Sequence, residues 1–168
     1  MVGKAPPRTS PDVLRPCGLY ASSSFGSVGL AEQEVHLRSP TSAETLLEVA
    51  RDPQHLGAEI GFFTVLHTWS QKLEPHPHVH FVVPAGGLSA DHARWIKPRY
   101  DFFLPVGVLG SVFRGKFYEA LKRAFQDGRL NFHGSLKLVA QPKIFAAWLR
   151  PMFRKDGVVY ANRPFWRP

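Results

Sequence analysis

The feature that most constrains this chain is the run His-Pro-His-Val-His-Phe-Val-Val at positions 76–83. Alternate residues of a β-strand point to the same face. A strand here therefore places His78 and His80 together and buries Val79 on the opposite face. Two neutral imidazoles on a rigid strand can bind one divalent ion, and the apolar residues that follow anchor the strand in a core. The run thus predicts a core strand with a metal site. Ordinary strand histidines, solvated or hydrogen-bonded, are the alternative interpretation.

A metal site on His78 and His80 needs a third ligand, and two residues compete for that role. A hairpin brings the residues that precede the histidine strand alongside it. Gln71 can reach the ion through its amide oxygen, and we take it as the third ligand. His67 is the competitor, since it can lie directly across from His80. Imidazole and amide-oxygen ligands suit Mg²⁺ or Mn²⁺ better than a structural zinc ion.

The composition fits one globular domain in a reducing compartment. A chain of 168 residues, 44% of them hydrophobic, is long enough to bury a core. No stretch approaches the roughly 18 apolar residues of a membrane span, and the N-terminus lacks the apolar region of a signal peptide. Cys17 is the only cysteine, which excludes an internal disulfide and a cysteine-based zinc site. The expected location is cytoplasmic.

Positive charge points to nucleic acid as the partner. The formal net charge is +8, and residues 94–155 carry thirteen Lys or Arg against three Asp or Glu, a surplus of ten. Such a field attracts a phosphate backbone, although a basic surface also serves solubility. Trp95 is the candidate stacking surface for an unpaired base. The candidate phosphate contacts are Lys97, Arg99, Arg114, Lys116, Lys122 and Arg123.

The first 40 residues differ in composition from the rest of the chain. They contain five prolines, six serines and four glycines, with few periodic apolar positions. We expect residues 1–40 to be disordered or unrelated to the domain that follows. Order is expected from Thr41, which has capping-box spacing to Glu44 and opens an apolar helical stripe that ends before Pro53.

The remaining segments predict an antiparallel sheet with helices packed on it, an α+β fold. Two strands form a hairpin, with His76 in the connecting loop because Pro77 interrupts strand pairing. Regular apolar spacing predicts the long helix that follows. The expected elements are strands at 60–69 and 78–84, a helix at 108–126, a strand at 130–132, a helix at 143–152 and a strand at 158–160.

Segments between residues 43 and 165 resemble, in order, those of one known family. That family is the two-tyrosine HUH transposases, which move insertion sequences by a rolling-circle route. The resemblance includes motifs such as Leu-His-Thr-Trp, His-Pro-His-Val-His and Phe-Phe-Leu-Pro-Val, and Ser70 stands where the family usually has glycine. The similar segments are 44–53, 55–63, 66–69, 76–80, 86–89, 102–106 and 158–165.

The resemblance implies an incomplete HUH endonuclease-like domain over residues 41–168, with a divalent metal on the histidine strand. It also implies DNA as the partner, preferably single-stranded, and neither a membrane nor a small-molecule substrate. The family's catalytic tyrosines lie in a helix downstream of the last matching segment, and the sequence ends before such a helix. The family's N-terminal cysteine-rich zinc module has no match in residues 1–40. We therefore expect the metal-binding and DNA-binding part of a DNA transposition protein, inactive alone.

Tyr118 is the remaining candidate for a nucleophile. It lies four residues before Lys122 on the expected helix, a spacing that resembles single-tyrosine HUH replication nucleases. A nearby cation can lower the pKa of a phenol. A half-buried structural tyrosine is the alternative, and we expect Tyr100 and Tyr160 to be structural. For the whole chain, the second hypothesis is a noncatalytic nucleic-acid-binding module or a decayed relic.

Overall fold

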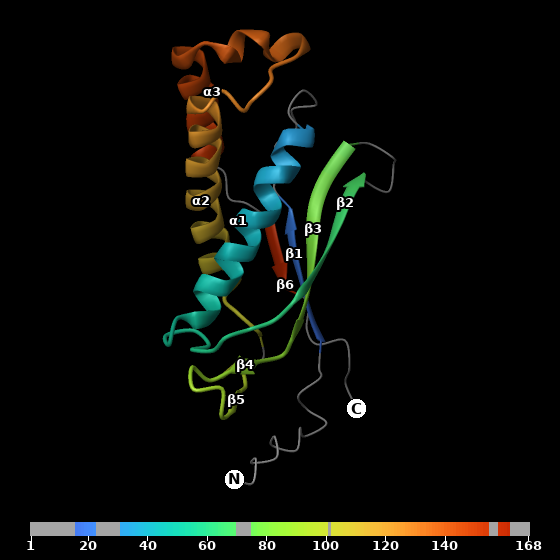
Figure 1. The fold of residues 1–168 in the computed structure, drawn as a ribbon, viewed down its shortest axis with the longest axis vertical. Helices are drawn as coiled ribbons and strands as arrows, with labels where there is room; N and C mark the ends of the chain where they lie inside the picture. The colour runs from blue at the N-terminus through green and yellow to red at the C-terminus, as the bar shows by residue number, and fades with distance from the viewer. Residues whose placement is uncertain (1–15, 23–30, 70–74, 101, 155–157, 162–168) are drawn as a thin grey trace, which may run out of the picture.

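The fold is a mixed α+β arrangement in which helices lie on one side of an antiparallel sheet (Figure 1). The computed structural model describes residues 16–22, 31–69, 75–100, 102–154 and 158–161. The expected fold class is confirmed at this level. Among the described residues, no helix combines the length and the apolar character needed to cross a membrane.

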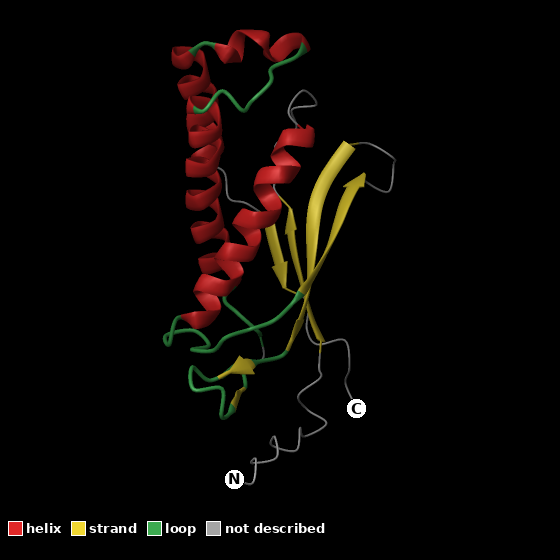
Figure 2. Cartoon of the chain, in the orientation of Figure 1, coloured by secondary structure: helices red, strands yellow, loops and turns green. Residues whose placement is uncertain are grey.

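Within the described ranges, the main sheet has four strands in the order β2-β3-β1-β6, and every neighbouring pair is antiparallel. Its longest strand, β3, pairs with β2 on one side and β1 on the other, so it lies inside the sheet (Figure 2). The strands are β1 (Pro16–Ser22), β2 (Phe63–Trp69), β3 (Pro75–Pro84) and β6 (Val158–Ala161). A small separate hairpin pairs β4 (Gly87–Leu88) with β5 (Trp95–Ile96).

The core lies between the sheet and two long helices, α1 (Ala31–Arg51) and α2 (Val106–Gln126). The buried residues Leu46 of α1, Leu109 of α2 and Val79 of β3 belong to one cluster. Residues four apart share a face of a helix, which explains why the apolar residues of α2 are buried together. The buried residues of α2 are Leu109, Phe113, Phe117, Leu121 and Ala124. Leu109 belongs to the core on the sheet, whereas Phe113, Phe117 and Leu121 belong to a second cluster.

A second, largely aromatic cluster joins α2 to the segments that follow it. These are the 3₁₀ helix η2 (Gly134–Ala140) and α3 (Pro142–Arg154). The rings of Phe125 and Phe145 stack with centroids 3.9 Å apart and an interplanar angle of 9°. Offset-stacked rings contribute beyond the area that they bury. This cluster fixes η2 and α3 against the end of α2.

Several expected elements are confirmed, including the β2–β3 hairpin and the helices α2 and α3. The expected strand at 130–132 is wrong, because residues 129–133 have no regular structure. Leu130 and Phe132 instead pack against the aromatic cluster. Two apolar residues separated by one residue suit a strand and equally suit a loop that covers a core. Sequence spacing alone did not separate these cases.

The expected helix start at Thr41 is also wrong, because α1 begins at Ala31 and crosses the boundary set at residue 40. The Thr41 hydroxyl does not cap a helix, since it donates to the Leu37 carbonyl one turn back, at 2.6 Å. The preceding segment contains β1, which lies between β3 and β6. The structure therefore places part of residues 1–40 inside the sheet.

Candidate functional site

His78 and His80 lie on β3, in the interior of the sheet. The residues that alternate with them, Val79, Phe81 and Val83, are at most 2% exposed and face the helices. Because alternate residues of a strand point to opposite faces, positions 78 and 80 lie on the sheet face away from α1 and α2. The expected burial of Val79 opposite the histidines is confirmed. We call the sheet face that carries positions 67, 78 and 80 the histidine face.

The strand register places a third histidine on the histidine face. His67 of β2 pairs with His78, and Val65 pairs with His80. Directly paired residues of an antiparallel sheet share a face, so positions 67, 78 and 80 lie together there. The expectation that His67 lies across from His80 is wrong by two residues.

The pairing of β2 with β3 is irregular at the end next to their connection. The β2–β3 pairing shifts between His67 and Trp69, and Trp69 pairs with Pro75. A bulge of this kind accommodates a residue that cannot donate to the ladder, and Pro77 is such a residue. His76 lies within β3 instead of in the expected loop, because β3 begins at Pro75.

On the other side of β3, β1 supplies positions that sequence analysis did not assign to the site. Tyr20 pairs with His80, and Tyr160 of β6 pairs with Tyr20. A row across the sheet therefore runs from Val65 through His80 and Tyr20 to Tyr160. The alternation of Cys17, Leu19 and Ala21 with more polar or smaller neighbours was the available strand signal. The proline-rich and serine-rich surroundings obscured it.

The donor types on the histidine face fit a divalent ion. Neutral imidazole is a ligand for first-row divalent metals, and three such positions on paired strands suit binding from one side. Gln71, the expected third ligand, lies outside the described residues. In the part of the chain that the structure describes, no three His, Cys, Asp or Glu side chains form a ready metal-binding group. The ligand assignment stays a prediction.

The candidate phosphate contacts lie in two regions of the molecule. Lys97 and Arg99 are exposed in the connection between β5 and α2. The others lie on α2, where Lys122 and Arg123 are exposed and Arg114 lies 5.9 Å from the Phe153 ring centroid. All of these remain predicted contacts.

Lys116 of α2 already has acidic partners. Its Nζ lies 2.8 Å from Glu48 Oε2 and 3.8 Å from Glu44 Oε2, both on α1. The hydrogen bond to Glu48 raises the pKa of Lys116 above its usual value. A phosphate that approached Lys116 would compete with these carboxylates. Lys116 therefore links the two helices in this structure.

Tyr118 lies on the helical side of the sheet. Its ring packs 4.8 Å from that of Phe153, between centroids, and beside the aromatic cluster of α2 and α3. The histidine face looks away from that layer. The geometry favours a structural role for Tyr118 over attack on a phosphate held at His78 and His80.

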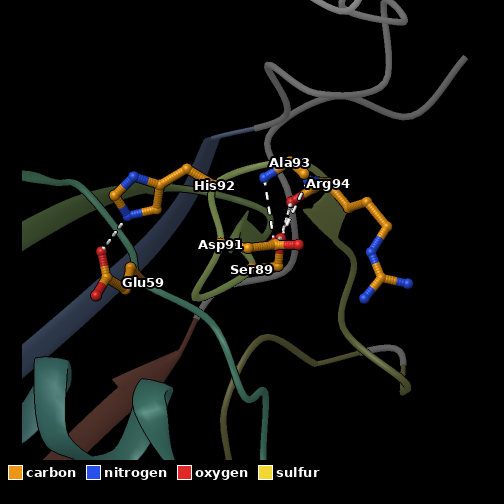
Figure 3. Close-up of polar contacts among 6 residues, drawn as sticks. All are labelled: Glu59, Ser89, Asp91, His92, Ala93 and Arg94. Carbon is orange, nitrogen blue, oxygen red and sulfur yellow. Dashed lines mark hydrogen bonds and ion pairs between the residues drawn. The ribbon is translucent and has the colours of Figure 1, made fainter.

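A polar network fixes the loop between β4 and β5 (Figure 3). His92 Nε2 lies 2.8 Å from Glu59 Oε2, and Ser89 Oγ donates to Asp91 Oδ1 at 2.5 Å. The hydrogen bond with His92, reinforced by its charge, lowers the pKa of Glu59. The hydrogen bond from Ser89 likewise lowers the pKa of Asp91. The same hairpin places the indole of Trp95 against Gly86, where an added Cβ would lie 2.5 Å from Trp95 Nε1.

The chain is similar in sequence to known proteins. The model of the family described as "Putative transposase" matches residues 61–168. A protein named "Putative transposase y4qJ" from Sinorhizobium fredii (strain NBRC 101917 / NGR234) is 50% identical over 127 residues, which cover 76% of this chain. The "Transposase for insertion sequence element IS801" from Pseudomonas savastanoi pv. phaseolicola is 43% identical over 48 residues, 29% of this chain. The matches span only 32% and 11% of those relatives, and no solved structure matches.

Proposed function

The chain belongs to the "Putative transposase" family, and from this premise we propose that it serves DNA transposition. We infer that it is the metal-binding and DNA-binding part of an HUH single-strand DNA nuclease. The observation that carries this proposal is the register that brings positions 67, 78 and 80 to one sheet face. The basic surplus between residues 94 and 155 supports DNA as the partner.

The protein's own contribution to this chemistry is a rigid set of ligands. β3 is paired on both sides, and Val79 and Phe81 anchor it in the core. This anchoring holds the backbone of His78 and His80 in place, with their neutral rings as ligands. Mg²⁺ or Mn²⁺ bound there would polarise a scissile phosphate and stabilise charge on it. His67 is the third ligand that the register supports, and Gln71 is the one that the hairpin spacing predicts.

Calorimetric titration with Mn²⁺ tests the metal site. We expect the wild type to bind, and the double variant His78→Ala, His80→Ala to bind more than about tenfold more weakly, because it lacks two of the direct ligands. His133→Ala is the matched control, since His133 is exposed and precedes η2. Its affinity for Mn²⁺ should equal that of the wild type. Equal heats for the wild type and the double variant would exclude the site.

Two single variants then assign the third ligand. If His67 binds the ion, His67→Ala weakens Mn²⁺ binding and Gln71→Ala does not. The opposite result assigns Gln71. Because both variants are compared with the same wild type, a general effect of truncation would appear in both.

A noncatalytic nucleic-acid-binding module is the second candidate function. The exposed cations Lys97, Arg99, Lys122 and Arg123 support it independently of the histidines. In that case single-stranded DNA affinity would be the same with and without Mn²⁺, and the double histidine variant would bind DNA normally. Affinity that rises with Mn²⁺ only when His78 and His80 are present favours the nuclease part.

A further inference from the structure

Two aromatic rings stand exposed in the segment that joins β5 to α2. Tyr100 is 66% exposed and Phe102 is 47% exposed. Their centroids lie 5.2 Å apart with an interplanar angle of 12°, so the rings stack on each other. Large aromatic side chains that remain this exposed are informative, because burial would otherwise stabilise the fold.

The residues that follow hold this pair in place. Phe103 is 5% exposed and Leu104 is 1% exposed, and both belong to the core cluster between the sheet and the helices. Immediately afterwards Pro105 leads into α2. Phe103 and Leu104 therefore anchor the chain in the core directly after Phe102.

The charge around the ring pair defines the chemistry of a partner. Lys97 and Arg99 are exposed and precede the pair in the same segment, by three residues and by one residue from Tyr100. Exposed aromatic faces beside cations form the general arrangement for unpaired nucleic acid, in which bases stack on rings and phosphates meet the charges. A purely apolar partner would gain no binding energy from the exposed cations Lys97 and Arg99. Trp95, the residue expected from sequence to stack on a base, lies half-buried against Gly86.

We propose that Tyr100, backed by Phe102, is a stacking platform for an unpaired base of single-stranded DNA, with Lys97 and Arg99 beside it for the adjacent phosphates. The proposal rests on the proposed function, in which DNA is the partner, and adds the place where a base is held. The outer face of Tyr100 contacts the base. Phe102 positions that ring, and neither residue distinguishes one DNA base sequence from another.

The test compares two oligonucleotides that carry the same phosphates. One is a thymidine strand of about 12 nucleotides, a length within the site sizes of single-strand binders. The other is the same backbone with abasic sites. Fluorescence anisotropy measures the affinity of the wild type and of Tyr100→Ala for each. We expect the wild type to bind the thymidine strand about 5- to 100-fold more tightly than the abasic strand. Tyr100→Ala should bind the two alike.

Comparing affinity for the thymidine strand with affinity for the abasic strand distinguishes a loss of stacking from a loss of folding or of charge. A variant that folds poorly binds both strands weakly, whereas loss of a platform weakens only the strand with bases. Tyr100→Trp should retain the preference for bases, because only a π-face is required. Leu138→Ala is the matched control, as Leu138 is 64% exposed on η2, away from the segment. It should behave as the wild type.

The possible failures are distinguishable. If the wild type binds neither strand at low salt, the proposed function itself is contradicted. If it binds both strands and Tyr100→Ala keeps the full preference for bases, the platform is excluded while DNA binding stands. If a second copy of the protein covers the two rings, Tyr100→Ala also keeps the full preference for the strand with bases. That outcome equally overturns the proposal.

Discussion

At the scale of single residues, the contact between Glu59 and His92 predicts that the stability of the fold depends on pH. His92 adopts a positive φ of 54°, and its Nε2 lies 2.8 Å from Glu59 Oε2. The hydrogen bond with His92 lowers the pKa of Glu59 below its usual value of 4.5. A carboxyl with a lowered folded pKa stabilises the folded state above its unfolded pKa, and this contribution is lost as the pH falls through the folded pKa.

We therefore expect Glu59→Gln to reduce the free energy of unfolding near neutral pH and to matter less in acid. The difference from the wild type should shrink as the pH falls below about 4.5. Urea unfolding at a series of pH values measures it. A difference that stays constant from neutral pH into acid would show that the contact carries no pH dependence.

At the scale of secondary-structure elements, replacing a glycine by alanine is expected to have opposite effects on stability at two positions. Gly87 of β4 lies close to residues 59 and 60, whereas Gly115 of α2 has open space around it. A Cβ at Gly87 would lie 2.4 Å from the Glu59 carbonyl oxygen and 2.9 Å from Ile60 Cγ2. A Cβ at Gly115, inside α2, would meet nothing within 4 Å. Gly87→Ala should therefore destabilise the fold by about 1–3 kcal/mol. Gly115→Ala should stabilise it by about 1 kcal/mol through helix propensity.

Thermal or denaturant unfolding of the two glycine variants measures both effects against one wild type. Gly115→Ala serves as the control, because it is the same substitution in an open place. Equal stability of the two variants would contradict the packing of β4 against residues 59 and 60.

The elements that sequence predicted share a strong local pattern. α2 has apolar residues four apart, and β3 alternates buried residues with histidines, so both were located well. β1 has a weak alternation, and its place between β3 and β6 depends on pairing with strands more than 50 residues away. The small β4–β5 hairpin depends likewise on the bridge between Glu59 and Leu88. Such long-range pairing is not visible in a local window.

For the candidate site, the positions that share a face of one strand were easier to predict than their partners on the neighbouring strand. The alternation of His78, Val79 and His80 fixed which positions share a face. The partner of each histidine depended on the register of β2 against β3, which no local pattern indicates. The surplus of basic residues was visible in the sequence, but the ion pair between Lys116 of α2 and Glu48 of α1 was not. The Tyr100–Phe102 pair became visible only when the burial of Phe103 and Leu104 was known.

At the scale of the whole molecule, the sheet separates two environments. On one side α1 and α2 bury Val79 and Phe81, and α2 carries the aromatic cluster farther along the chain. On the other side lie the positions of His67, His78 and His80. Figure 1 shows both long helices on the same side of the sheet. A divalent ion bound by these residues would therefore approach from the histidine face only.

Paramagnetic broadening by Mn²⁺ tests this claim directly, with methyl-labelled valines as reporters. Val65 pairs with His80 and is 42% exposed, whereas Val139 is 6% exposed in the aromatic cluster of α2 and α3. We predict that the methyl signals of Val65 broaden at low Mn²⁺ while those of Val139 stay sharp, and that the double variant His78→Ala, His80→Ala abolishes the broadening. Broadening of Val139 before Val65, or unchanged broadening in the double variant, would contradict a metal site on the histidine face.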